Sequence, residues 1–464
     1  MVIWSRDQRR IQRIKRRSQP RSAAHRRLRI GGDVVKFVGA IVVVWNLISF
    51  ASYVSTENGD TVSQRMATWG RDHHLASTID WLEVHVYNDP PSKEPAKALA
   101  LNSPTLEPVV TTVTTTIPPG ATVIEQPDTA ATATTIPPSV ASAAAGPTTA
   151  GPTTGAPTTA APTTAAPTTA VPAPDTVPAP AAPAALAPVF TPPLAGEGQW
   201  APIARAGGVD TMWATSIRPL PAAGGVVASM VVIDQTHVRA GLFNGGEEPG
   251  GTWKRGNRVP KDLQPALLAA FNGGFRFEHT KGGYKTEGVE LMPLRTGGAT
   301  LAVGTDGRVR VGQLGRDLFD DGSWISLRQN LILIVDNSQS QVQRGIDQGV
   351  WWGADYGREV YVPRSAACEM ADGRLAYALV GKVNAEQLAE SLINIGCVKA
   401  IQLDINGTWP VFFTFGPDSG GNLIGRFVDT RMGGNPYRYL NGSTKEFFAF
   451  FDSSLVAPAS VLDG

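Results

Sequence analysis

Three polar, glycine-containing segments follow apolar runs in the C-terminal half of the sequence: AAFNGGF (269–275), VPRSAACEM (362–370) and IQLDINGTW (401–409). In each segment the apolar run gives way to a residue that forms directional hydrogen bonds, namely Asn272, Arg364 or Asp404. Loops at strand ends present functional groups from a rigid frame, so these three residues are the first candidates for chemistry. A carboxylate can attack carbon or activate water, and an arginine can hold a phosphate at two points.

Each of the three residues also has a purely structural interpretation. Asn272 and Gly273 form a common turn pair, and Arg364 can pair with a glutamate on the surface of a sheet. Asp404 can cap its own loop through the backbone amides that follow it. The residues alone leave these alternatives open.

Five motifs stand in a fixed order along the C-terminal half: NGGF, PRSA, DGR, AEQLAESLINIG and LDINGTW. Their order and spacing resemble the phosphodiester glycosidase family, which includes N-acetylglucosamine-1-phosphodiester α-N-acetylglucosaminidase, the uncovering enzyme. The resemblance covers residues 225–450 of this membrane-anchored, bacterial-looking chain. It implies a hydrolase that cleaves glycosyl-1-phosphodiester linkages in glycans or glycolipids of the cell envelope.

The resemblance also implies a role for each residue of the candidate site. Asp404 is expected to act as nucleophile or as base for water, and Arg364 to bind the phosphate. Asn272 and the amides of Gly273 and Gly274 would hold phosphate or sugar hydroxyls. The leaving phosphate monoester has a second pKa of about 6 and departs without prior protonation, so one carboxylate can suffice.

The last motif departs from the family pattern, because Ile405 and Asn406 replace two glycines and Thr408 replaces a serine. Such a loop is either rebuilt for another substrate or has lost activity, and the second case gives a rival function: a non-catalytic module that binds glycan or phosphate. Further residues expected at the substrate are Asn406, Gly407, Thr408, Glu287, His279 and Trp409. Trp351, Trp352 and Phe412 are candidate sugar-stacking faces, with core packing as the alternative.

The elements that must position these residues fit an α+β domain, a mixed β-sheet with packed helices, over residues 196–464. Two Asp-Gly pairs, at Asp306 and Asp372, predict hairpins. The pattern of residues 384–395 predicts a helix capped by Asn384 and stopped by Gly396. Strands are expected over 226–233, 237–243, 267–271, 300–303, 308–311, 331–335, 359–362 and 398–403.

The N-terminal half predicts a membrane tether. Residues 1–33 form a basic cytoplasmic tail, and residues 34–54 a transmembrane signal anchor whose stretch 37–54 carries no charge. The positive flank places the N-terminus in the cytoplasm and the C-terminal domain outside the cell or in the periplasm, so membrane and not nucleic acid is the expected partner of the basic run. Residues 55–94 read as a juxtamembrane helical segment and residues 95–195 as a Pro/Thr/Ala-rich disordered linker.

Cys368 and Cys397 lie in the half of the chain expected to be exported, where thiols oxidise, so the two form a candidate disulfide. A metal site is not favoured, because the sequence has no His-x-x-x-His, cysteine-rich or multi-aspartate cluster. No cofactor is expected, and a structural Ca²⁺ stays open.

Overall fold

The computed structural model describes residues 23–55, 62–70, 88–101, 180–353, 360–405, 409–457 and 460–463, together with residues 73, 75 and 78. The chain divides into two units, of which the first comprises Met1–Leu106 and Ala179–Gly464 and the second Glu107–Pro178. The second unit lies outside the described residues. Most of the predicted linker, 95–195, therefore does so too.

The largest of three sheets carries the segments that contain Arg364 and Asp404. It is built in the order β1 (Ala201–Ala206), β2 (Val209–Ile217), β3 (Ala228–Ile233), β14 (Leu375–Val383), β13 (Val362–Met370), β15 (Cys397–Ile405), β11 (Val335–Asp336) and β12 (Gln339–Ser340). Strand β13 pairs antiparallel with both β14 and β15, and Arg364 lies opposite Ile405. The ends of the two candidate segments are thereby brought together.

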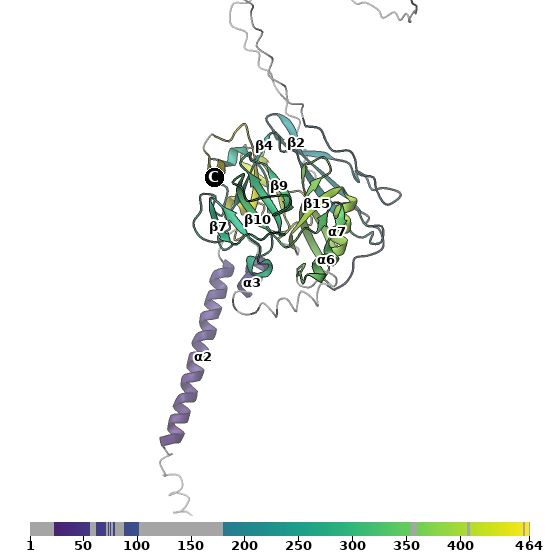
Figure 1. Cartoon of the computed structure of the whole chain (residues 1–464). Coiled ribbons are helices and arrows are strands. Elements are labelled where there is room, and N and C mark those ends of the chain that lie inside the picture. The colour runs from purple at the N-terminus through teal and green to yellow at the C-terminus, as the bar shows by residue number, and fades with distance from the viewer. Residues whose placement is uncertain are drawn as a thin grey trace, which may run out of the picture. The chain divides into compact units, whose positions relative to one another are not determined.

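Two five-stranded sheets complete the domain, which is labelled in Figure 1. One has the order β7 (Val289–Met292), β6 (Tyr284–Thr286), β10 (Trp324–Gln329), β8 (Ala299–Gly304) and β9 (Val309–Gln313). The other has the order β17 (Leu423–Phe427), β16 (Phe412–Pro417), β5 (Leu267–Asn272), β18 (Phe447–Asp452) and β4 (Val238–Phe243). Short helices join the strands: α5 (Phe277–Thr280), α6 (Val342–Asp347), α7 (Ala385–Asn394) and α8 (Arg438–Asn441).

An aromatic core fixes the end of β5, where Asn272 stands. The Phe271 ring lies 5.2 Å from that of Tyr377 on β14 and 5.4 Å from that of Phe448 on β18. Every residue of β18, FFAFFD, is buried because the strand lies between β5 and β4 and packs against other elements on its faces. Large aromatic rings with such contacts contribute much of the burial energy of a core.

Local sequence signals agree well with the structure. Asp306-Gly307 and Asp372-Gly373 turn the hairpins β8–β9 and β13–β14. Helix α7 begins with a capping box between Asn384 and Gln387, and Gly396 follows its end with a φ of +97°. The α+β expectation holds only in part, because the domain is mostly β-sheet with few helices.

Two strand predictions need correction. Of the stretch 331–335 only Val335 belongs to a strand, because Leu331 has a φ of +59°, which breaks the extended backbone. The strand expected over 359–362 begins only at Val362, and residues 354–359 lie outside the described residues. Strands β1, β2, β6, β7, β10, β12, β16, β17 and β18 were not predicted.

The predicted membrane segment is helical, because α2 (Ala23–Ser55) contains residues 34–54. Across the residues that the structure describes, no helix combines the length and the apolar character needed to cross a membrane. The membrane crossing thus stays a prediction. Helix α3 (Val62–Gly70) falls inside the segment expected to be helical at 55–94.

Both described ends of the predicted linker contact the folded domain. On the N-terminal side, Gly225 N donates to Ser92 O (2.9 Å) and Ala96 N donates to Gly224 O (2.9 Å). A Cβ on Gly224 would lie 2.8 Å from Pro95 Cα, so glycine is needed where this segment passes. On the C-terminal side, Trp200 Nε1 donates to Ala184 O (2.9 Å). Residues on both sides of the linker thus contact the folded domain, and the boundary at residue 196 stays a prediction.

Candidate active site

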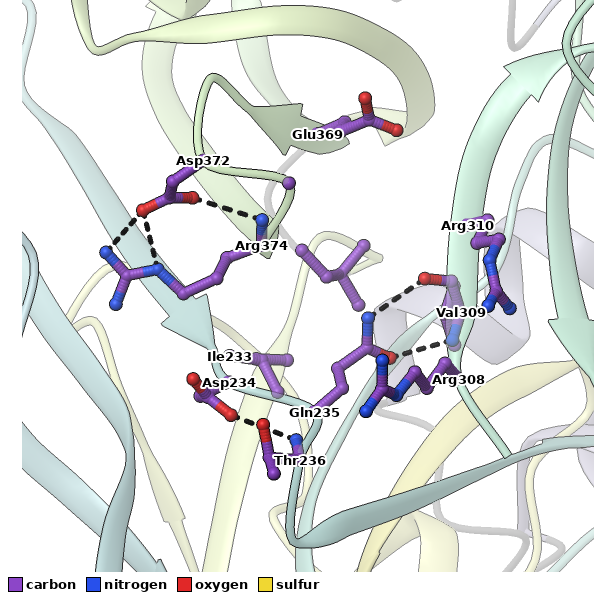
Figure 2. A pocket seen from close by; sticks show the side chains of 12 residues that line it. Ile233, Asp234, Gln235, Thr236, Arg308, Val309, Arg310, Glu369, Asp372 and Arg374 are labelled. Carbon is purple, nitrogen blue, oxygen red and sulfur yellow. Dashed lines mark hydrogen bonds and ion pairs between the residues drawn. The ribbon is translucent and has the colours of Figure 1, made fainter. Parts of the chain in front are cut away.

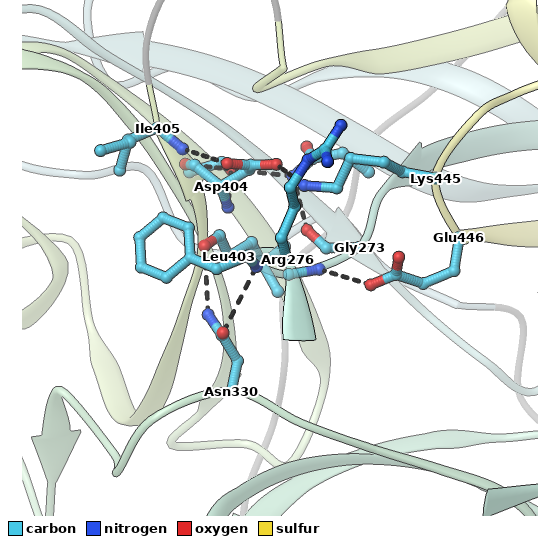
Figure 3. A network of polar contacts seen from close by, with 12 residues as sticks. Gly273, Arg276, Asn330, Leu403, Asp404, Ile405, Lys445 and Glu446 are labelled. Carbon is cyan, nitrogen blue, oxygen red and sulfur yellow. Dashed lines mark hydrogen bonds and ion pairs between the residues drawn. The ribbon is translucent and has the colours of Figure 1, made fainter. Parts of the chain in front are cut away.

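A cluster of charged side chains occupies the region where β5, β10 and β15 end and β18 begins. Figure 3 labels four members of this cluster, Asp404, Lys445, Glu446 and Arg276, together with Gly273. We call it the Asp404 cluster, and it consists of Asp404, Lys445, Glu446, Arg328, Arg276 and Glu248. Three of these residues carry a negative charge when ionised and three a positive one.

Asp404 ends the buried strand β15 and is held on both its backbone and its side chain. Ser365 Oγ donates to Asp404 O (3.0 Å) and accepts from Asp404 N (3.2 Å). The Asp404 Oδ1 accepts from Ile405 N (2.9 Å), and its Oδ2 accepts from Lys445 Nζ. The carboxylate is thus fixed, paired with one cation, and 8% exposed.

Lys445 links this carboxylate to an aromatic face. Its Nζ lies 4.9 Å from the centroid of the Trp409 ring, a distance at which an ammonium is attracted to an indole. Trp409 is partly exposed. The sequence placed Trp409 near substrate, and the structure places it beside the cation that pairs with Asp404.

Glu446 fixes the Gly273–Gly274 loop by accepting hydrogen bonds from both of its amides. Its Oε1 accepts from Gly274 N (3.0 Å) and from Arg328 Nε (2.7 Å), and its main-chain oxygen accepts from Gly273 N (3.0 Å). A Cβ on Gly273 would lie 2.4 Å from Glu446 Oε1. The expectation that these two amides bind substrate needs correction, because both donate to Glu446. At Gly274 a Cβ would lie 3.0 Å from Asn330 Cγ, so a different side chain restricts that position.

Glu248 is a buried carboxyl of the cluster with an altered acidity. Burial raises its pKa to about 7, the cation of Lys445 acts against this shift, and the charge of Glu446 adds to it. Glu248 Oε2 is buried and has no hydrogen-bond partner among the described residues. Its backbone lies against the start of β18, since Glu248 N donates to Thr444 O (2.9 Å). A carboxyl with a pKa near neutrality can exchange a proton at physiological pH.

Asn272 lies in the same region but its amide is fully occupied. Its Oδ1 accepts from Tyr377 Oη (3.0 Å) and from Val411 N (3.0 Å). Its Nδ2 donates to Ser365 Oγ (3.2 Å) and to Gly273 O (2.9 Å). Asn272 therefore ties β5 to β14 and to Ser365, and through Ser365 it helps to position Asp404.

Arg364 also differs from the expectation. It is completely buried, and its guanidinium donates to the main-chain oxygens of Val383 (3.0 Å), Val360 (3.2 Å) and Trp352. The expected role in phosphate binding needs correction, because these donors hold three chain segments together. The cation that pairs with Asp404 is instead Lys445.

The other candidates fall in three places. Glu287 lies in the turn between β6 and β7, and its carboxylate accepts from the backbone amides of Lys254 (2.9 Å) and Arg255 (2.8 Å). His279 lines a cavity beside α5, and its Nε2 lies 3.4 Å from Glu278 Oε1. Asn406, Gly407 and Thr408 lie outside the described residues.

The two cysteines expected to pair are joined in a disulfide between β13 and β15, with their Cα atoms 5.7 Å apart. It lies toward the end of these strands remote from Arg364 and Asp404, since Met370 pairs with Cys397. Among the described residues, no group of three His, Cys, Asp or Glu side chains could hold a metal ion.

Sequence reasoning missed five members of the cluster: Glu248, Arg276, Arg328, Lys445 and Glu446. One signal was present: STKEFFAFFD places a charged pair directly before an apolar run, the reverse of the order that selects Asp404, which follows one. Glu248 had no such signal, because it lies in a glycine-rich loop.

The sequence that builds this site resembles a known protein family. Residues 266–404 match the family model of the phosphodiester glycosidases. The match begins just before β5 and ends at Asp404, so the resemblance to this family includes the strands that carry Asn272, Arg364 and Asp404. No curated protein matches the sequence.

The solved structures similar to this chain include the following two. One is the zebrafish N-acetylglucosamine-1-phosphodiester α-N-acetylglucosaminidase catalytic domain auto-inhibited by pro-peptide. The two sequences are 16% identical, the match covers 55% of this chain and 87% of that chain, and the TM-score is 0.37. The other is a hypothetical protein from Synechocystis, with 10% identity, 54% and 64% covered, and a TM-score of 0.35.

Proposed function

From the match of residues 266–404 to the phosphodiester glycosidases, we propose that this domain hydrolyses glycosyl-1-phosphodiester linkages in glycans or glycolipids of the cell envelope. The observation that carries the proposal is the pairing of Asp404 with Lys445 beside the partly exposed Trp409 ring. It supplies a fixed carboxylate, a cation for phosphate and an apolar face for a sugar within one cluster.

In the proposed first step, the Asp404 carboxylate attacks the anomeric carbon of the sugar. The bond between that carbon and the phosphate oxygen breaks, and its electron pair leaves with the phosphate. Lys445 and Arg276 balance the charge of the departing group. Both cations lie close enough to Glu248 to affect its charge, so they belong to one electrostatic environment.

In the proposed second step, water replaces Asp404 on the anomeric carbon. Glu248 takes a proton from this water as it attacks, and Asp404 leaves as a carboxylate. A base with a pKa of about 7 is suited to this task near neutral pH. The departing phosphate needs no proton, so the second carboxyl of the site is free to serve as base rather than acid.

Hydrolysis in ¹⁸O-labelled water tests the proposal. We expect the label on the anomeric oxygen of the released sugar, because the carbon–oxygen bond breaks. Label found only on the released phosphate would mean that the phosphorus–oxygen bond breaks, and the glycosidase assignment would then be wrong.

A second candidate function is a binding module without turnover. Ile405 favours it, because the family has a glycine at this position and the Ile405 side chain packs with Phe275, Val360 and Val362. Binding of a sugar-1-phosphodiester by the intact protein, with no release of sugar at any pH, would support this function over hydrolysis.

We also propose that residues 34–54 anchor the protein in the cell membrane, with the N-terminus in the cytoplasm and the catalytic domain outside. The support is the basic flank together with the exposed apolar side chains of α2 from Ile41 to Ile48. Protease added to intact spheroplasts should remove the C-terminal domain and leave the N-terminal tail protected. The reverse pattern would refute this orientation.

A further inference from the structure

A cavity of about 580 Å³ lies beside the Asp404 cluster, and we call it the Trp351 cavity. Gln329 and Leu331 line it, whereas Asn330 between them does not. Asn330 Nδ2 donates to Leu403 O (3.1 Å), directly before Asp404. The cavity and the cluster therefore share the segment 329–331 as a common wall.

The charged groups around the Trp351 cavity are mostly positive. Lys281, Arg295 and Arg344 line it, and all three are exposed. The one carboxylate in the lining, Asp336, is paired with Arg316, whose Nη1 lies 2.6 Å from Asp336 Oδ2. The cavity thus offers cations to an anionic ligand and little negative charge to repel it.

A second cavity provides the contrast and is shown in Figure 2. It measures about 290 Å³ and lies between the two Asp-Gly hairpins. Its arginines are matched by acids: Arg374 pairs with Asp372 at 2.6 Å, and Asp234 and Glu369 also line it. Its charges are close to balanced, so an anion gains little there.

The Trp351 cavity also has a rigid polar floor and an apolar wall. Gln329 is 1% exposed, and its Oε1 accepts from Arg295 N (2.7 Å) and Gly283 N (3.1 Å). Trp351 is 52% exposed at the rim. An exposed indole beside fixed amides is a combination suited to stacking against a sugar ring.

We infer that the Trp351 cavity binds the next repeat of a polymeric substrate, namely an anionic glycan whose sugars are joined through phosphodiesters. Trp351 receives the sugar ring, and Lys281, Arg295 and Arg344 receive the phosphate of that repeat. The inference rests on the proposed function, because it extends the substrate of the Asp404 cluster from one diester to a chain of them.

The test compares two substrates on the full-length protein: a simple sugar-1-phosphodiester and an oligomer of sugars joined by phosphodiesters. In the double variant K281Q/R295Q the KM for the oligomer should rise about tenfold more than the KM for the simple diester, as expected for two partly exposed charge contacts. The difference should shrink at high salt, since exposed charges are screened. Trp351→Ala should act in the same direction without the salt dependence.

Arg308→Gln is the matched control, because Arg308 is an exposed arginine that lines the cavity of Figure 2. It should leave the ratio of the two KM values unchanged. An equal effect of K281Q/R295Q on both substrates, or no effect on either, would overturn the inference while hydrolysis itself still stood.

Binding separates this inference from the proposed function. If the protein hydrolyses neither substrate, the affinity of intact protein for the oligomer is measured by calorimetry instead. Loss of affinity in K281Q/R295Q but not in Arg308→Gln would support the cavity as a glycan-phosphate site on a non-catalytic module. Unchanged affinity in both variants would reject the cavity.

Discussion

Asp404→Asn is expected to lower kcat for a sugar-1-phosphodiester on the order of 10²–10⁴-fold while leaving substrate binding nearly intact. The amide has the shape of the carboxylate, so its oxygen can still accept from Ile405 N, as Asp404 Oδ1 does at 2.9 Å. What disappears is the negative charge paired with Lys445. Single-turnover kinetics together with equilibrium binding measure the two effects separately.

Glu248→Gln is the variant to compare with Asp404→Asn, because it removes the proposed base of the second step and leaves the proposed nucleophile in place. Because the pKa of Glu248 is about 7, the wild-type rate should rise as pH increases through this value, where the base loses its proton. The variant should lack that rise and be slower above it. A wild-type rate for Asp404→Asn would show that Asp404 is not the reacting carboxylate.

The predictable parts of the fold are those with local causes. The Asp-Gly turns set the register of two hairpins, and Asn384 with Gln387 caps α7, because in each case the interaction spans only a few residues. The strands that were missed include β18, whose sequence FFAFFD has no alternation between apolar and polar residues. Such a run indicates burial on both faces but does not distinguish a strand from a buried helix.

The sequence predicted which segments form the candidate site better than it predicted what each residue does there. Asp404 was found because a polar residue ends an apolar strand, and Arg364 was found by the same reasoning. Only the three-dimensional structure separates them, since Asp404 pairs with a lysine whereas Arg364 is fully enclosed by main-chain oxygens. Burial of a charged side chain depends on the segments that cover it, which here include residues 352 and 383.

The glycines of the NGGF motif illustrate the same difficulty. Their presence suggested close approach of a ligand, which is a common reason for glycine. Here the side chain close to Gly273 is that of Glu446, more than 170 positions away in the sequence, and the side chains close to Gly274 are those of Asn330 and Arg328. A sequence pattern records that space is restricted at a position, but it does not identify the group that restricts it.

Glu446→Ala is expected to destabilise the domain by about 3–5 kcal/mol, because it leaves the Arg328 charge buried without its carboxylate. The side chains of Arg328 and Glu446 are 2% and 0% exposed, and the Arg328 Nε to Glu446 Oε1 distance is 2.7 Å. The free energy of unfolding from urea titration measures the loss. Loss of the acceptor for Gly274 N adds to it, since a buried amide without a partner is costly.

Two further variants make this prediction specific. Arg310→Ala breaks the exposed pair with Asp306, in which the two side chains are 40% and 44% exposed, and should cost about 0–1 kcal/mol. It leaves the Asp306 carboxylate that accepts from Arg308 N in the turn. Replacing both partners, as R328M/E446L, should recover much of the stability lost in Glu446→Ala, because no buried charge is then unpaired. If Glu446→Ala cost no more than Arg310→Ala, the buried pair would not be what holds the Gly273–Gly274 loop. The position of Asp404 would then depend instead on Ser365 and Asn330. Ser365 on β13 accepts from Asp404 N, and Asn330 donates to Leu403 O at the end of β15.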